Sequence, residues 1–146
     1  MIELYNYLNY FHIELTQDSG AEIARKKDAL FTHNGIILGR NRYSHETMVF
    51  HNHKDTNGPS VVTLSEFENG NPFYYTKRKS DSRDVVLLRS FKQLETNKNY
   101  ALVTYNCQDA TKLSREGRTG SHAVANTLGT VAVVGLLALI LGGGED

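Results

Sequence analysis

The sequence predicts an α+β fold, in which a small antiparallel sheet packs on helices. In the first half of the chain, short stretches of β-branched and aromatic residues are separated by Gly and Asn turns, which is typical of strands joined by hairpins. From Ser80 onward the apolar residues instead recur every three positions, which is typical of a helix with one buried face. The length of 146 residues suits one domain.

The strands are expected between the turn signals of the first half. Residues 1–19 have no clean period, so their structure stays open and they are treated as an N-terminal arm. Beyond the arm, strands are predicted at 20–27, 36–38, 43–50, 60–64 and 73–77. A turn at 39–42 would join the second and third of these strands into a hairpin.

Two helices are expected in the second half. The first lies within 80–98 and would bury a stripe formed by Val85, Leu88, Phe91 and Leu94. The second begins after Asn106, a residue type suited to capping a helix N-terminus, and Gly117 closes it.

The residues 121–146 form a predicted hydrophobic C-terminal helix. No charged residue occurs from Ala123 to Gly144. A helix over 121–141 would be roughly 30 Å long, about the hydrocarbon thickness of a bilayer. We expect this segment to anchor the chain to a membrane. A helix buried in the core or in an oligomer, and a flexible tail, are the alternatives.

Composition bounds the partners and the compartment. Sixteen basic residues balance sixteen acidic ones, so no overall positive field indicates a nucleic-acid partner. Cys107 is the one cysteine, which excludes an intramolecular disulfide and suits a reducing compartment. The N-terminus is too polar for a signal peptide. We therefore expect a membrane-associated protein whose catalytic domain is cytoplasmic.

Cys107 is the candidate nucleophile. It falls in the first turn of a predicted helix, where the helix dipole lowers a thiol pKa and favours the thiolate. Such a nucleophile needs a base, usually a histidine. His33 and His45 flank the predicted hairpin turn and would face each other across antiparallel strands. Spacing alone leaves a buried structural cysteine and two surface histidines as open alternatives.

Two blocks of the chain then resemble a known family. The block HNGIILGRNRYSH, from His33 to His45, is similar to the first catalytic block of the lecithin retinol acyltransferase family. The stretch around Asn106-Cys107 is similar to the second. The resemblance includes the LFTH, Gly-Ala-Glu-Ile and LSEFENG stretches and runs from Gly20 to Gly129.

The resemblance implies a fold and a reaction. The fold is a circularly permuted papain-like core of the NlpC type, over residues 20–120. Cys107 would be the nucleophile, His33 the general base and His45 its orienting partner. The substrate would be a phospholipid or another acyl lipid. From their positions directly before Cys107, and not from the resemblance, Tyr105 and Asn106 are expected to contact it, with packing of Tyr105 in the core as the open alternative. The activity is that of a thiol acyltransferase or phospholipase that forms an acyl-cysteine thioester, with no metal and no organic cofactor. The oligomeric state is not predicted.

The chain departs from the family beside the nucleophile. Family members continue Asn-Cys-Glu-His-Phe, whereas Gln108, Asp109 and Ala110 follow Cys107 here. Two other functions therefore stay open: a cysteine peptidase or amidase on the same fold, and a non-catalytic membrane- or partner-binding module like the viral 2A proteins with an H-box and an Asn-Cys motif. His51 and His53 supply only two potential ligands, fewer than a zinc site requires.

Overall fold

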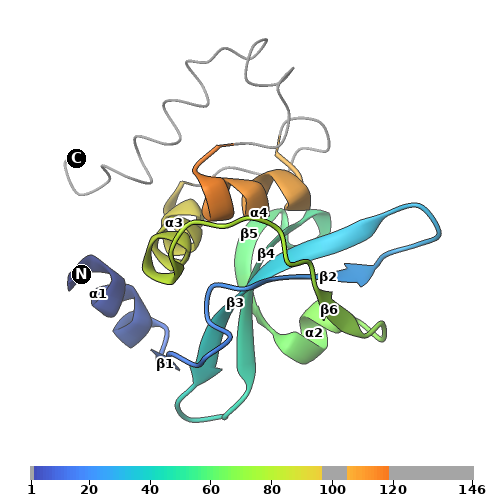
Figure 1. Cartoon of the computed structure of the whole chain (residues 1–146). Coiled ribbons are helices and arrows are strands. Elements are labelled where there is room, and N and C mark those ends of the chain that lie inside the picture. Colours follow the sequence, from blue (N-terminus) through green and yellow to red (C-terminus); the bar gives the residue numbers. More distant parts are fainter. Residues whose placement is uncertain (1, 97–104, 119–146) are drawn as a thin grey trace.

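The computed structural model describes residues 2–96 and 105–118, and within them it has the predicted α+β architecture (Figure 1). Six strands form one sheet in the order β5-β4-β3-β2-β6, with β1 paired to β3, and every pairing is antiparallel. The strands are β1 (Ile13–Glu14), β2 (Glu22–Lys26), β3 (Thr32–Asn41), β4 (Thr47–His53), β5 (Gly58–Thr63) and β6 (Phe73–Tyr75). The helices are α1 (Ile2–Tyr10), α2 (Leu64–Glu68), α3 (Arg83–Glu95) and α4 (Cys107–Glu116), with a 3₁₀ turn η1 (Lys54–Thr56).

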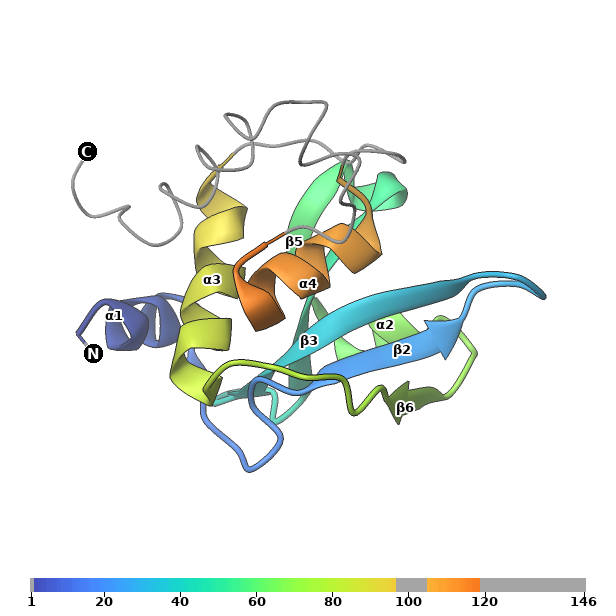
Figure 2. The same ribbon diagram turned by 45° about the horizontal axis from the view of Figure 1, so that its top comes forward.

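The two faces of the sheet carry separate cores. Helices α1, α3 and α4 cover one face, and α2 packs on the other (Figures 1 and 2). Along β3, Ile36 and Leu38 join the core under α3 and α4, whereas Ile37 packs toward Phe67 of α2. This alternation follows from the two-residue period of a strand, and it explains why the sequence of β3 is apolar over several consecutive residues.

The N-terminal residues belong to the larger core. Leu4 and Leu8 of α1 and Ile13 of β1 are buried in the cluster that includes Phe91 of α3. Tyr7 stacks on Phe91 with ring centroids 5.2 Å apart. The segment without a clean sequence period therefore contributes a helix and a short edge strand to the domain.

The predicted hairpin turn at 39–42 is wrong. Strand β3 continues through Asn41, and the turn to β4 lies at 42–46. Gly39 sits inside the strand at a bulge, with a φ of 152°. A Cβ there would lie 2.3 Å from the carbonyl oxygen of Glu14 in β1. The glycine thus permits close approach of a neighbouring strand and does not form a turn.

The two predicted helices are confirmed, with one change. Helix α3 lies within the predicted range, but its most buried apolar residues are Val86, Leu87 and Phe91 and not the regular stripe expected from the sequence. The reason is that α3 lies between α1 and α4 and contacts the sheet as well, so more than one face is covered (Figure 2). Helix α4 ends at Gly117, which has a φ of 77° as predicted for a C-terminal cap.

The predicted C-terminal helix at 121–146 lies outside the described residues. Among the residues that the structure does describe, no helix is both long and apolar enough to cross a membrane.

Candidate active site

Helix α4 begins with a complete capping box that fixes the backbone next to the nucleophile. The side chain of Asn106 accepts hydrogen bonds from the backbone N–H groups of Gln108 (2.9 Å) and Asp109 (3.0 Å). In return, the carboxylate of Asp109 accepts from the N–H of Asn106 at 3.1 Å. Asp109, which departs from the family pattern, therefore has a structural role here. Asn106 itself, predicted to contact substrate, is the N-cap of the helix.

Cys107 lies against strand β3 at the residues on either side of His33. Its sulfur is 3.9 Å from the carbonyl oxygen of Thr32. The backbone N–H of Asn34 also points to the sulfur and favours the thiolate. Two distant parts of the sequence thus meet at this point, through the backbone on either side of His33.

The sulfur occupies a place where two strands separate. Backbone groups along a strand alternate between its two neighbours, and both groups of Ile37 bond on the β2 side. By that alternation, the C=O of Thr32 and the N–H of Asn34 face β4. The last paired residues of β3 and β4 at this end are Gly35 and His51, so the pairing does not reach Asn34. Cys107 therefore meets backbone groups that β4 no longer pairs.

The imidazole of His33 is held by a second histidine. Nε2 of His33 lies 2.9 Å from Nδ1 of His51 on β4. The ring of His33 stacks on Phe67 of α2 with centroids 5.1 Å apart, and the ring of His53 lies 4.7 Å away on the other flank. Because His51 engages Nε2, the nitrogen of His33 that could accept a proton from another group is Nδ1.

Burial keeps these histidines neutral. Only 1% of His33 and 6% of His51 is exposed. Burial lowers the pKa of His33 to about 2, and the neighbouring His51 and His53 lower it further. Burial likewise lowers the pKa of His51 to about 4. At neutral pH both rings are therefore uncharged, and a pKa this far below 7 makes His33 a weak base in this buried state.

The thiol pKa differs from the sequence prediction. Burial raises the pKa of Cys107, and this outweighs the opposing effects of the Asn34 N–H, the charge of Lys27 and the N–H groups of the first helical turn. The prediction of a depressed pKa considered the helix terminus and a nearby imidazole but not burial, whereas packing against β3 removes solvent from the sulfur. The resting state is a neutral thiol.

His45 does not lie near this site, so its predicted pairing with His33 is wrong. It is exposed in the turn between β3 and β4, with a φ of 62°, and its N–H bonds the carbonyl of Asn41. His33 lies at the opposite end of the ten-residue strand. The displaced turn explains the error, because the longer hairpin brings His51 to the level at which the sequence placed His45.

His51 is the residue that the sequence reasoning missed in this role. It had been considered only with His53 as a metal-ligand pair. The sequence feature that could have indicated its position is the apolar stretch Met48–Phe50 directly before it, which pairs with the apolar centre of β3. Within residues 2–96 and 105–118, no group of three or more His, Cys, Asp or Glu side chains has the geometry to hold a metal ion.

Tyr105, the other predicted substrate contact, has a buried ring. It is fully inside the core under α3 and α4, and its hydroxyl donates to the side chain of Gln93. Its carbonyl accepts a 2.9 Å hydrogen bond from the side chain of Asn52 on β4. These contacts hold the backbone that precedes Cys107 against the sheet. They favour a structural role for Tyr105 over direct contact with substrate.

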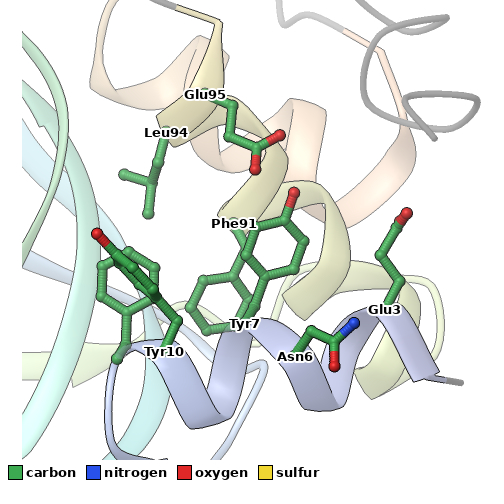
Figure 3. Close-up of a pocket in the computed structure, with 8 residues that line it drawn as sticks. Glu3, Asn6, Tyr7, Tyr10, Phe91, Leu94 and Glu95 are labelled. Atoms are coloured by element: carbon green, nitrogen blue, oxygen red, sulfur yellow. The ribbon is translucent and has the colours of Figure 1, made fainter. Parts of the chain in front are cut away.

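A groove lies elsewhere, between α1 and α3 (Figure 3). It encloses about 530 Å³. The hydroxyl of Tyr7 points to Glu95, and burial together with this contact raises the pKa of the tyrosine. No residue of the Cys107 site lines it. The lining residues are Glu3, Asn6, Tyr7, Tyr10, Phe11, Phe91, Leu94 and Glu95.

No family model matches the chain, and a search of the curated proteins finds no match either.

Proposed function

We propose that the chain is a thiol acyltransferase or phospholipase that uses Cys107 as nucleophile and His33 as general base. One observation carries this proposal: the sulfur contacts the backbone on both sides of His33, while His51 engages the far nitrogen of the His33 ring. A nucleophile, a base and a group that orients the base form the usual arrangement for covalent catalysis. His51 takes the orienting role that the sequence gave to His45.

The proposed reaction starts from a neutral His33 imidazole and a neutral Cys107 thiol. With the proton of His33 on Nε2, where it donates to His51, Nδ1 accepts the proton of the Cys107 thiol. The sulfur then forms a bond to the ester carbonyl carbon of the lipid, the ester C–O bond breaks, and His33 returns the proton to the leaving alcohol. Water, an alcohol or an amine next attacks the thioester and releases the thiol. In the free protein the ring of His33 packs on Phe67, so this step requires the imidazole to turn toward the sulfur of Cys107 when substrate binds.

An oxyanion donor is available at the start of α4. The cap uses the N–H groups of Gln108 and Asp109, whereas the N–H of Cys107 points toward its own sulfur. In the proposed reaction this N–H stabilises the tetrahedral oxyanion, a contribution of roughly 2.7–4 kcal/mol per donor in other enzymes.

The proposed fold family and substrate follow the sequence resemblance. A helix that carries the nucleophile at its N-terminus and packs on an antiparallel sheet carrying the histidines supports a permuted papain-like core over 20–120. The uncharged segment within 121–146 supports association with a membrane, which supplies acyl lipid as substrate. The catalytic domain would then lie on the cytoplasmic side.

A non-catalytic binding module is the second candidate, and burial favours it. His33 is almost fully covered and its ring packs on Phe67, on the face of the sheet opposite α4. The raised pKa of Cys107 also makes the resting thiol unreactive.

Intact mass spectrometry separates the two candidates. The full chain is incubated with phospholipid vesicles, and an added fatty acyl mass that hydroxylamine removes is expected, since hydroxylamine cleaves thioesters. The matched control is Cys107→Ser, which keeps the shape of the site and replaces the thiol. If the wild-type chain gains no acyl mass while the same vesicles acylate an unrelated lipid-hydrolysing thiol enzyme, the proposed reaction with acyl lipid is wrong.

A further inference from the structure

The turn that joins β2 to β3 exposes two large apolar side chains. We call residues 27–31 the hairpin tip. Leu30 is 85% exposed and Phe31 is 61% exposed. The hairpin projects away from the helices, so that its tip stands clear of both cores (Figures 1 and 2).

The hairpin tip is an ordered turn. The carboxylate of Asp28 accepts hydrogen bonds from the N–H groups of Leu30 (2.8 Å) and Phe31 (3.0 Å), and the N–H of Lys27 donates to the carbonyl of Phe31 at 2.9 Å. The backbone is therefore fixed in a form that directs the two apolar residues outward. Exposed apolar pairs held in this way mark interaction surfaces.

The charges around the tip are mainly positive. Lys26, directly before the tip, and Lys27, its first residue, are both exposed. The one acidic side chain of the tip, Asp28, accepts hydrogen bonds from backbone N–H groups. Apolar side chains flanked by lysines match a bilayer with anionic headgroups, where the apolar groups enter the acyl region and the lysines meet phosphate.

The tip also adjoins the candidate nucleophile. Phe31 is followed by Thr32, whose carbonyl contacts the sulfur of Cys107, and then by His33. The charge of Lys27 reaches the same sulfur. A bilayer that received the tip would therefore lie within a few residues of the thiol.

We propose that the hairpin tip docks on an anionic phospholipid surface, with Leu30 and Phe31 inserted and Lys26 and Lys27 at the headgroups. The docking surface consists of residues outside the C-terminal segment and orients the catalytic site toward its substrate. It deepens the proposed function and rests on it for the identity of the substrate as a lipid, although the docking itself can be measured without catalysis.

The sequence contains no tryptophan, which allows a local test. Phe31→Trp and Tyr43→Trp are made separately in the full chain. Tyr43 is a matched control because it is 74% exposed in the turn at the opposite end of β3. With vesicles that contain phosphatidylserine, the Phe31→Trp emission should shift to the blue and be quenched by brominated acyl chains, whereas Tyr43→Trp should not respond.

A second variant pair measures the contribution to binding. Leu30→Ser combined with Phe31→Ser should weaken vesicle binding about tenfold or more, because each large apolar side chain buried in lipid contributes a factor of that order. Lys27→Glu should weaken binding to anionic vesicles and leave binding to neutral vesicles unchanged.

Three results would overturn the docking surface. They are no response of Phe31→Trp on vesicles, an equal response of Tyr43→Trp, or a concentration-dependent blue shift without vesicles, which would mean that the tip joins two protein copies. All fluorescence measurements are repeated in the Cys107→Ser background. A positive Phe31→Trp response with no acylation of wild-type Cys107 would then reject the proposed catalysis and keep the docking surface.

Discussion

One histidine lies at each end of β3, His33 within the strand and His45 in the turn that follows it, and their surroundings differ sharply. At the His33 end the ladder to β4 stops, three imidazoles gather beside Phe67, and a helix N-terminus brings in Cys107. At the His45 end the ladder continues to Arg40 opposite Thr47, and a turn closes the hairpin in solvent.

The comparison shows how strongly burial determines the chemistry of a side chain. His33 has lost almost all solvent, and its pKa falls to about 2 because the charged form cannot be hydrated. His45 is exposed in a turn. The two histidines thus differ in burial, and only His33 belongs to the strand segment whose backbone contacts the Cys107 sulfur.

The largest expected effect is on catalysis. His33→Gln should slow acylation of Cys107 by roughly 100-fold or more, because a positioned general base contributes that much. His45→Gln should leave the rate within about twofold, since exposed groups far from a site have little influence on it. The rate is measured as the appearance of acyl mass on the intact chain. Equal losses in the two variants would mean that the sequence prediction of His45, and not the geometry, identifies the partner of the base.

The second effect is on stability at acidic pH. His33 has a folded pKa of about 2 against an ordinary value of ~6.5, so below pH 6.5 the unfolded chain binds a proton that the folded chain does not. The stabilisation is complete above pH 6.5 and is lost as the pH falls toward 2. Between pH 7 and pH 5 the loss from His33 alone is about 2 kcal/mol. Urea unfolding at the two pH values measures it.

Matched variants assign this pH dependence to one residue. His33→Gln should remove its share of the loss, and His45→Gln should leave the loss unchanged. His51, with a pKa lowered to about 4, adds to the fall in the wild type and in both variants. A loss that is the same in His33→Gln as in the wild type would show that His33 is solvated in solution.

The third effect concerns the orientation of the base. His51→Phe keeps a ring on β4 and removes the acceptor for Nε2 of His33. One lost hydrogen bond of about 1 kcal/mol corresponds to roughly a tenfold slower acylation. The loss should be smaller than that of His33→Gln and should be partly restored in His51→Asn, whose amide oxygen can accept the bond. An unchanged rate in His51→Phe would limit His51 to packing.

Much of the fold could be predicted from the sequence because the signals are local. The helix predicted within 80–98, the cap at Asn106 and the glycine after α4 depend on nearby residues of the chain, and each appears where expected, although the buried stripe of the first helix does not. The turn between β3 and β4 could not be placed in the same way. Gly39 looks like a turn residue, but its role depends on Glu14 of β1, which is distant in sequence.

In the candidate site, too, local features could be predicted from the sequence, whereas features that depend on contacts between distant residues could not. Cys107 at a helix start follows from the cap alone, whereas the partner of His33 depends on strand register, which one misplaced turn alters. The thiol pKa also escaped prediction, because burial against β3 is a tertiary property. The interpretation of Tyr105 was ambiguous from sequence for the same reason.

The smallest expected effect compares the two asparagines that organise the two ends. Asn106 accepts hydrogen bonds from two N–H groups at the start of α4, and Asn41 accepts two, from Tyr43 and Ser44, in the turn that contains His45. Asn106→Ala and Asn41→Ala therefore each remove a side chain that caps two backbone N–H groups, one beside Cys107 and one at the other end of β3. Loss of the cap should reduce the free energy of unfolding by about 1 kcal/mol, and loss of the turn contacts should reduce it by a similar amount.

The two asparagine variants should differ in catalysis. Asn106→Ala frees the first turn of α4, on which the position of the Cys107 sulfur depends, so acylation should slow several-fold in chains that are still fully folded by circular dichroism. Asn41→Ala should show the wild-type acylation rate at matched folded fraction, because its turn has no contact with the site. The urea midpoint and the intact-mass rate are read from the same two preparations. If Asn41→Ala slowed acylation as much as Asn106→Ala, the two ends of β3 would be coupled through the strand, and the separation drawn between them would be wrong.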